Sequence, residues 1–339
     1  MESSNKTNYF YISVLTVVSS FAVVMLHCNG IFWEGPTGSH WLSATIIETL
    51  FYFAVPIFFM ISGCTLIDYK KRYSTKEFFI KRATKAGIPF IVWSLVALGV
   101  TLYESPEKEI SLIGDILNHR YMGIYWFFMP LFAIYLCIPV LADIKNKIPT
   151  FTYMASLGLV TISTFGFMRD WGVQDIPISL NSPICGGFLI YPLLGYILHH
   201  QELSKKVRIT IYILGLASTI SHFSFTYICS LRIGVIYPFF KNYTYITTVL
   251  QACAVFVFIK QLSHQLEKLN MVKKAILYIQ PAALGIYLTH SYAISLFVSL
   301  GIAPESILFR TIGAIIIYLT LALVIRQLQR VRILRVILP

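Results

Sequence analysis

The run Tyr9–Gly30, YFYISVLTVVSSFAVVMLHCNG, decides the fold class of this chain because its 22 residues contain no Asp, Glu, Lys or Arg. A helix needs about 20 consecutive apolar residues to cross the hydrocarbon core of a bilayer. Similar runs recur along all 339 residues, of which 57% are hydrophobic and 12% are charged. We therefore predict an all-α protein, a polytopic transmembrane bundle of about ten spans.

Polar segments divide the chain into ten apolar runs, and the sixth is short enough to be tilted or broken. The expected spans are Tyr9–Gly30, Leu42–Leu66, Ala86–Tyr103, Gly123–Leu141, Phe151–Met168, Ile184–Leu198, Ile209–Tyr227, Tyr243–Ile259, Ile276–Leu300 and Ile307–Ile325. No long polar insert separates them. We expect a single transmembrane domain over residues 1–339, without an appended hydrolase or binding domain.

The net charge of +12 does not indicate nucleic-acid binding, because the basic residues form short clusters between apolar runs. With the N-terminus in the cytoplasm, 21 of the 27 Lys and Arg residues fall in inner segments. This bias satisfies the positive-inside rule at every loop pair. The sequence thus predicts a multi-pass protein of the plasma membrane with both termini cytoplasmic.

Several kinds of site are not indicated by the sequence. The six cysteines all lie in apolar runs and show no metal-ligand or redox spacing, so we interpret them as small buried hydrophobes. We find no metal cluster, no phosphate-binding glycine loop and no serine-nucleophile elbow. No metal is expected.

Polar groups inside the expected spans are the candidates for chemistry, because a titratable group in hydrocarbon needs a partner, a cavity or a function. Ser13, Thr16, Ser20 and His27 share one face of the first span. Glu48 lies a little over a turn into the antiparallel second span, at a similar depth, so it could orient His27 as a general base. The alternative is a structural hydrogen bond between two helices.

A second group of candidates lies in later spans. His290 and Tyr287 are near the middle of the ninth span and could line the same cavity to bind substrate, although a satisfied core histidine is the alternative. Tyr125 and Trp126 open the fourth span. Such aromatic residues are usually interfacial belt residues, but they also bind sugar rings.

The loop after the second span is denser in positive charge than orientation requires. Ser74 and Glu77 predict a helix start by capping, and this helix carries Lys81, Arg82 and Lys85 toward the third span. These cations could bind an anionic cytosolic donor such as a coenzyme A nucleotide. The alternative is topology and contact with lipid headgroups.

Four blocks in order along the chain resemble the acyltransferase-3 family of integral membrane acyltransferases. They are Val55–Gly63 (VPIFFMISG) with Phe78–Arg82 (FFIKR), Ile88–Phe90 (IPF), Tyr125–Phe128 (YWFF) through Tyr135 and Pro139, and Gly285–His290 (GIYLTH). Each block is moderately specific, and the resemblance covers essentially the whole chain.

The resemblance implies about ten helices, a cytosolic acetyl-CoA or other acyl-CoA donor, and O-acylation of an extracytoplasmic or lipid-linked saccharide. His27 matches the histidine of the first span that the family uses catalytically. The resemblance implies that position 16 belongs to the donor site, since the family pattern places an arginine there, and this chain has Thr16. Donor binding would then depend on Arg82, Lys85 or another group, or this chain marks a subgroup with changed donor use or lost activity.

We therefore expect an enzyme that moves an acetyl or other short acyl group onto a hydroxyl of a cell-surface polysaccharide or its lipid-linked precursor. The competing hypothesis is a transporter or flippase that moves a glycan or a lipid-linked sugar without chemistry. Membrane lipid is the expected surrounding in both cases. The acceptor glycan and the oligomeric state, a homo-oligomer included, stay open.

Overall fold

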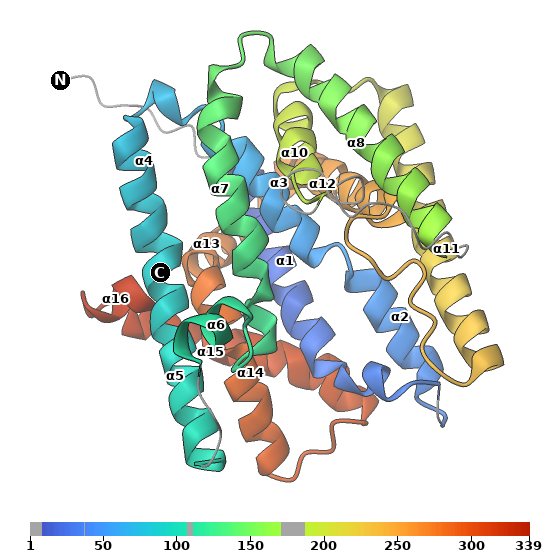
Figure 1. The fold of residues 1–339 in the computed structure, drawn as a ribbon, viewed down its shortest axis with the longest axis vertical. Helices are drawn as coiled ribbons and strands as arrows, with labels where there is room; N and C mark the ends of the chain where they lie inside the picture. Colours follow the sequence, from blue (N-terminus) through green and yellow to red (C-terminus); the bar gives the residue numbers. More distant parts are fainter. Residues whose placement is uncertain (1–8, 37, 107–110, 171–186) are drawn as a thin grey trace.

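The computed structural model describes residues 9–36, 38–106, 111–170 and 187–339, and the regular elements in these ranges are all helical. Eight helical stretches in the described residues are long and apolar enough to cross a membrane, and some of them comprise two or more of the labelled elements. Helices α8 (Lys147–Asp170) and α10 (Ile190–His200) lie on either side of residues that are not described. The all-α membrane bundle predicted from the sequence is confirmed (Figure 1).

Helix α1 (Phe10–Cys28) lies at the centre of the bundle. It contacts α3 (Ala54–Leu66), α12 (Ile246–Leu266), α14 (Ala283–Ser299) and α15 (Ala314–Leu328). Ser20 of its polar face hydrogen-bonds Tyr318 of α15, with 2.8 Å between the hydroxyl oxygens. Ser13 and Ser20 are both buried, so at these two positions the polar face of α1 points into protein and not toward lipid.

The expected second span is two helices, α2 (Trp41–Phe51) and α3, joined by a turn at Tyr52 and Phe53. Helix α10 packs closely against α3. A Cβ atom added to Gly63 of α3 would lie 2.0 Å from the Pro192 carbonyl oxygen, and one added to Gly195 of α10 would lie 2.2 Å from the Met60 carbonyl oxygen. Glycine allows this close approach because it has no side chain.

The expected basic helix starts as the capping pattern predicts. Ser74 Oγ accepts a hydrogen bond from the Glu77 backbone N–H, at the start of α4 (Thr75–Arg82). A π-helical turn, η3 (Ala83–Gly87), continues α4 into α5 (Ile88–Glu104) without a break. The cations of α4 are therefore rigidly attached to the third span.

The remaining elements follow in chain order. They are η1 (Gly30–Glu34) after α1, η2 (Tyr69–Lys71) after α3, α6 (Leu112–Leu117), η4 (Gly123–Phe127), α7 (Phe128–Asp143), α11 (Lys205–Ile233), α13 (Asn270–Ile279), η6 (Gln280–Ala282), η7 (Phe309–Gly313) and α16 (Leu334–Ile337). The start of the predicted sixth span at Ile184 lies outside the described residues.

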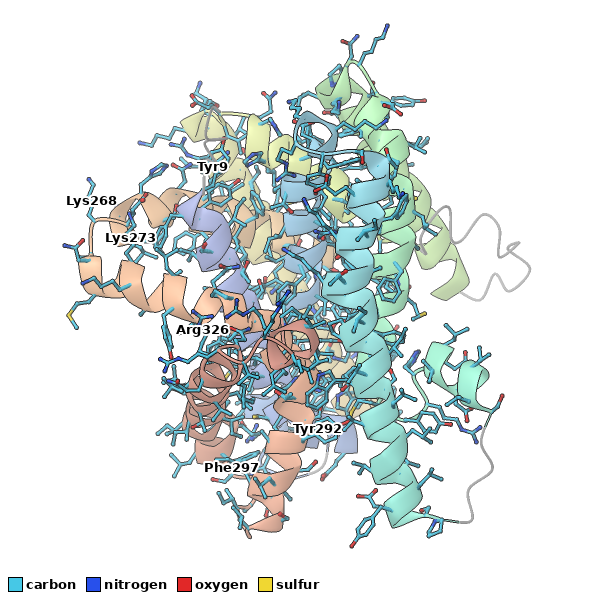
Figure 2. The ribbon with its side chains drawn as sticks, turned by 90° about the vertical axis from the view of Figure 1, so that its left-hand side faces the viewer. Tyr9, Lys268, Lys273, Tyr292, Phe297 and Arg326 are labelled. Atoms are coloured by element: carbon cyan, nitrogen blue, oxygen red, sulfur yellow. The ribbon has the colours of Figure 1, made fainter. Side chains whose placement is uncertain are left out.

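The predicted ninth span is divided at the short turn η6, which contains Pro281 and lies between α13 and α14. Figure 2 shows α13, with Lys268 and Lys273 at its outer end, running across the bundle before α14 descends toward Phe297. None of the α13 residues is buried. The lysines of this segment are held at the edge of the bundle, as expected for a helix at a membrane interface.

Helix α11 is polar on its inner side and apolar on its outer side. Its buried positions are all small or polar, namely Gly215, Ser218, His222, Thr226 and Ser230. Its exposed large residues include Leu216, Ile220, Phe225, Ile228 and Leu231. This reversal of the pattern of a soluble protein is what a lipid-facing helix requires.

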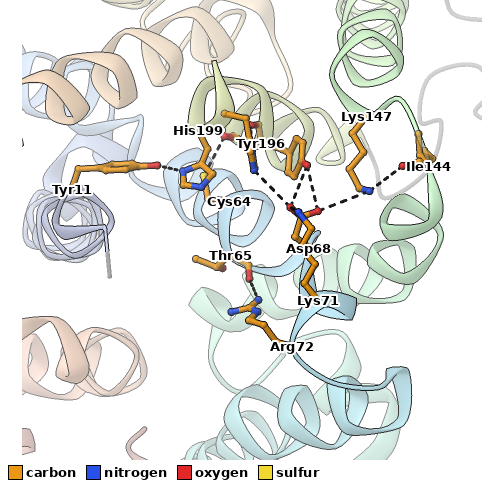
Figure 3. Close-up of polar contacts among 12 residues, drawn as sticks. Tyr11, Cys64, Thr65, Asp68, Lys71, Arg72, Ile144, Lys147, Tyr196 and His199 are labelled. Atoms are coloured by element: carbon orange, nitrogen blue, oxygen red, sulfur yellow. Dashed lines mark hydrogen bonds and ion pairs between the residues drawn. The ribbon is translucent and has the colours of Figure 1, made fainter. Parts of the chain in front are cut away.

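A cluster of polar contacts around Asp68 joins three parts of the chain at the end of α3 (Figure 3). The carboxylate lies 2.7 Å from the Lys71 ammonium, 3.9 Å from that of Lys147 at the start of α8, and 3.3 Å from the Tyr196 hydroxyl of α10. Arg72 also donates to the Thr65 carbonyl. These contacts fix the end of α3, which forms one wall of the cavity described next.

Candidate active site

A cavity of about 1130 Å³ lies between α1, α3, the continuous α4–α5 helix, α7 and the segment that follows α15. Thr16, Ser62 and Thr65 contribute hydroxyl groups to its wall, and Phe127 and Tyr287 contribute aromatic rings. Its cationic lining consists of Arg82, Lys85, Arg326, Arg330, Arg332 and Arg335. The cavity is large enough for an extended ligand with a polyanionic part.

The described lining contains no Asp or Glu side chain beside these cations. Arg82 lies over the rings of Phe78 and Tyr135, with its guanidinium carbon 5.9 and 5.7 Å from the ring centroids. The Nε atoms of Arg82 and Arg326 are buried and have no hydrogen-bond partner among the described residues. Buried, unpaired guanidinium donors favour an anionic ligand such as a phosphate.

Three of the four residues proposed from the sequence for donor binding line this cavity: Thr16, Arg82 and Lys85. The fourth, Lys81, is directed elsewhere. Its ammonium lies 2.7 Å from the Glu77 carboxylate and 4.0 Å from the centroid of the Tyr73 ring. The structure therefore separates Lys81 from the other three.

His27 and His290 form a pair of neighbouring imidazoles. Their ring centroids are 4.8 Å apart, and the planes are inclined at 54°. His27 is exposed, whereas His290 is fully buried behind it on α14. His27 can therefore be reached from outside the packed core, while the position of His290 is fixed by its surroundings.

Tyr287 separates the basic cavity from this histidine pair. Its ring lines the cavity and lies 5.9 Å from the His290 ring, centroid to centroid. The Tyr287 hydroxyl donates to the Ile124 carbonyl, and its ring packs on Phe127 at 5.4 Å. A single side chain, that of Tyr287, therefore separates the cavity from the histidine pair.

The sequence allowed a pair between Glu48 and His27, but in the structure Glu48 does not pair with His27. Its carboxylate forms an ion pair with Lys241, from the loop between α11 and α12, and both side chains are about 5% exposed. The rings of Phe32, Trp33 and Tyr52 surround the ammonium, with centroids 4.4–4.7 Å away. A lysine is a stronger partner for a buried carboxylate than a neutral imidazole is, because it carries a full positive charge.

Lys241 also connects this ion pair to the histidines. The ammonium is close enough to His27 and to the buried His222 to act on both electrostatically. The second carboxylate oxygen of Glu48 and Nε2 of His222 have no hydrogen-bond partner among the described residues. The region beside His27 is therefore polar although it lies within the bundle.

The two aromatic residues at the start of the fourth span differ in their roles. Tyr125 is buried, and its hydroxyl donates to the Leu288 carbonyl at 2.9 Å, which ties η4 to α14. Trp126 is half-buried and stacks on Tyr243, with centroids 5.4 Å apart. Trp126 is thus accessible to a ligand, whereas Tyr125 fixes the helix that carries His290.

Sequence reasoning missed two contributions to this region. The sequence does not single out Lys241, because no local pattern marks it as the partner of Glu48, 193 positions away. In the sequence, the basic residues of the inner segments indicate topology, and they include Arg326, Arg330, Arg332 and Arg335. The presence of four arginines within the ten residues 326–335 was the available sequence clue to an anion site.

Together, these features define a polytopic membrane protein with a basic cavity on one side of a histidine pair. The chain belongs to the acyltransferase-3 family, since the family model described as an acyltransferase domain matches residues 9–326. Comparison with curated proteins and comparison with solved structures gave no significant match. Membership in this family implies an enzyme that transfers acyl groups, and it favours this class over a transporter.

Proposed function

We propose that this protein transfers an acetyl or other short acyl group from acyl-CoA to a hydroxyl of a cell-surface or lipid-linked saccharide. The observation that carries the proposal is the position of the basic cavity next to the His27–His290 pair, with Tyr287 between them. Transfer between two substrates requires both to reach one reacting centre.

The donor part of the proposal depends on the cavity lining. Coenzyme A carries phosphates at one end and the thioester at the other, so its site needs cations at one part and a route to the base at another. The six cationic side chains and the buried Nε atoms of Arg82 and Arg326 match the phosphates. The hydroxyls of Thr16, Ser62 and Thr65 suit the amides of the pantetheine arm.

Four arginines near the C-terminus replace the arginine that the family has at position 16 and this chain lacks. These C-terminal arginines are Arg326, Arg330, Arg332 and Arg335. Thr16 lines the same cavity as Arg326 and Arg330. A guanidinium reaching the cavity from the end of α15 supplies positive charge without an arginine on α1. The chain can therefore keep acyl-CoA as its donor, with the phosphates bound by Arg82, Lys85 and the C-terminal arginines.

His27 serves as the general base in the proposed reaction. It takes the proton of the acceptor hydroxyl as the oxygen forms a bond to the thioester carbonyl carbon. The carbon–sulfur bond then breaks, and His27 returns the proton to the coenzyme A thiolate, so no proton is gained or lost overall. Trp126, which is half-buried, offers a ring face for the acceptor saccharide.

The orientation in the plasma membrane follows from the charge distribution. With both termini in the cytoplasm, the basic cavity opens toward the cytosolic donor, and His27 lies near the outer end of α1. The acceptor approaches from the opposite side. In this proposal Glu48 acts through Lys241 on the electrostatic environment of His27 and makes no contact with the acceptor.

Purified protein in lipid nanodiscs tests the proposal when it is incubated with [¹⁴C]acetyl-CoA and a panel of bacterial surface oligosaccharides. Covalent label on an oligosaccharide, detected by mass spectrometry and removed by mild base, is the expected result. Liposomes with the protein and a fluorescent lipid-linked saccharide test the alternative. Vectorial movement of that saccharide without any label transfer would contradict the proposed enzyme and support a transporter.

A further inference from the structure

The hydrogen bonds of His290 determine which of its ring nitrogens carries a proton. Nδ1 lies 2.7 Å from the Tyr287 carbonyl oxygen and 3.2 Å from the Ile286 carbonyl oxygen. A carbonyl oxygen can only accept a hydrogen bond, so Nδ1 is the protonated nitrogen. In a neutral imidazole, Nε2 then carries a lone pair and is an acceptor.

This acceptor is buried and has no partner. Nε2 of His290 makes no hydrogen bond within the described part of the chain, although the residue is fully buried. Buried polar atoms are normally paired, so an orphan beside a reacting group calls for a functional explanation. Nε2 of His290 is therefore the nitrogen that a hydrogen-bond donor must approach.

Two rings that could donate lie next to His290: His27 and Tyr287. The Tyr287 hydroxyl already donates to the Ile124 carbonyl. His27 makes no hydrogen bond through its ring among the described residues, and its centroid lies 4.8 Å from that of His290. The His27 ring is therefore the neighbouring group whose N–H is available to the free Nε2 atom.

We infer that His290 is a positioning residue that accepts the ring N–H of His27 at Nε2 and so directs the other nitrogen of His27 toward the acceptor hydroxyl. The inference rests on the proposed function, in which His27 is the base. It gives the neutral His290 the orienting role that the sequence had suggested for Glu48, whose carboxylate is bound by Lys241.

The proton balance of the reaction fits this arrangement. When His27 takes the acceptor proton it becomes an imidazolium, and its second N–H becomes a stronger donor to Nε2 of His290. His290 stays neutral throughout, because the two carbonyls hold its own proton on Nδ1. His27 then releases the acceptor proton to the thiolate, which restores the starting state of the pair.

Three substitutions at one position separate this role from packing. In His290→Gln, the side-chain oxygen reaches the place of Nε2 and keeps an acceptor there. In His290→Asn, the shorter amide keeps contact with the backbone carbonyls but ends before that place. His290→Phe keeps a ring and removes both functions. Each is assayed in nanodiscs for kcat, for the KM of acetyl-CoA and for thermal stability, with His27→Ala measured in parallel.

The inference predicts that His290→Phe and His290→Asn lower kcat on the order of 10- to 100-fold, as loss of an orienting partner does. His290→Gln should recover at least about tenfold of that loss, and the KM of acetyl-CoA should stay within about twofold of wild type in all three. If the Phe variant does not fold, the comparison of Gln with Asn decides alone. Equal kcat values for Gln and Asn, or losses that follow thermal stability only, would overturn the inference.

The same experiment separates failure of the inference from failure of the proposed function. If His27→Ala still transfers label at the wild-type rate, the proposed base is wrong and the inference falls with it. If His27→Ala is inactive while His290→Phe is as active as wild type, the proposed function stands and the positioning role of His290 is wrong.

Discussion

The Lys241 ammonium and the Glu48 carboxylate form an ion pair inside the bundle, with side chains 4% and 5% exposed. Removing one partner of a buried pair leaves an uncompensated charge and typically costs about 3–5 kcal/mol. We expect Lys241→Met to lower stability by this amount, measured as the unfolding midpoint in detergent. The double variant Lys241→Met with Glu48→Gln should regain most of the loss, because both charges are removed.

Lys241→Met and Glu48→Gln are also measured separately. If the stability loss of the double variant equals the sum of these two losses, the buried ion pair is contradicted. Lys273→Met serves as the control. Lys273 pairs with Glu267 at 2.9 Å, and both side chains are exposed, at 39% and 46%. Exposed pairs contribute about 0–1 kcal/mol, so this control should change the midpoint little.

The contact between α3 and α10 is expected to tolerate no side chain at Gly63. An added Cβ would meet the Pro192 backbone oxygen at 2.0 Å, and backbone cannot move aside as a flexible side chain can. Gly63→Ala should therefore lower stability by roughly 1–3 kcal/mol or more through overpacking. Gly99→Ala in α5 is the matched control, since nothing lies within 4 Å of its Cβ position. Equal stability of the two variants would rule out the close approach.

The basic cavity predicts a difference between two neighbouring cations of α4. Arg82→Gln should raise the KM of acetyl-CoA roughly 10- to 100-fold, because a hydrogen bond to a charged group contributes about 1.5–3 kcal/mol. Lys81→Gln should leave KM near its wild-type value, since Lys81 is paired with Glu77. Initial rates over a range of acetyl-CoA concentrations measure both. Equal increases would mean that general positive charge, and not the cavity lining, binds the donor.

Asp115 predicts a dependence of local stability on pH in the segment around α6. Its carboxylate accepts hydrogen bonds from the Tyr121 hydroxyl, the Ser111 amide and the Arg120 guanidinium, and these lower its pKa, the first of them most. A carboxyl whose folded pKa lies below its unfolded value of about 3.9 stabilises the fold above that value. This stabilisation is lost as the pH falls through the folded pKa.

Hydrogen exchange of residues 111–121, corrected for intrinsic rates, measures this effect. Protection should be constant above about pH 4 and should fall below it in the wild type, whereas Asp115→Asn should show low protection at every pH. A wild-type profile that is parallel to that of Asp115→Asn would exclude the carboxylate as the cause.

Local patterns in the sequence predicted the helices well. The uncharged run at α1, the capping by Ser74 and the continuity of α4 with α5 depend on neighbouring residues, so the sequence contains what is needed. The break at Pro281 was missed because the apolar character continues on both sides of it. Hydropathy indicates how long an apolar segment is, but it does not show where the helix breaks and changes direction.

The candidate site was less accessible from the sequence, because its pairs join distant positions. His27 and Glu48 were placed at a similar depth, yet the carboxylate is bound by Lys241 from a loop 193 positions away. His290 was expected near the same cavity, but its contact with the His27 ring depends on how α1 and α14 are rotated against each other. Helix rotation is set by packing, which no spacing rule specifies.

The most direct test of the account is the single-turnover rate of [¹⁴C]acetyl transfer from acetyl-CoA to a saccharide by His27→Ala, compared with His264→Ala, in which the replaced histidine is exposed at the end of α12. General-base catalysis typically contributes about 10²–10⁴-fold. We predict a loss of that size in His27→Ala, with donor affinity unchanged and no loss in His264→Ala. Transfer by His27→Ala at the wild-type rate would contradict the account.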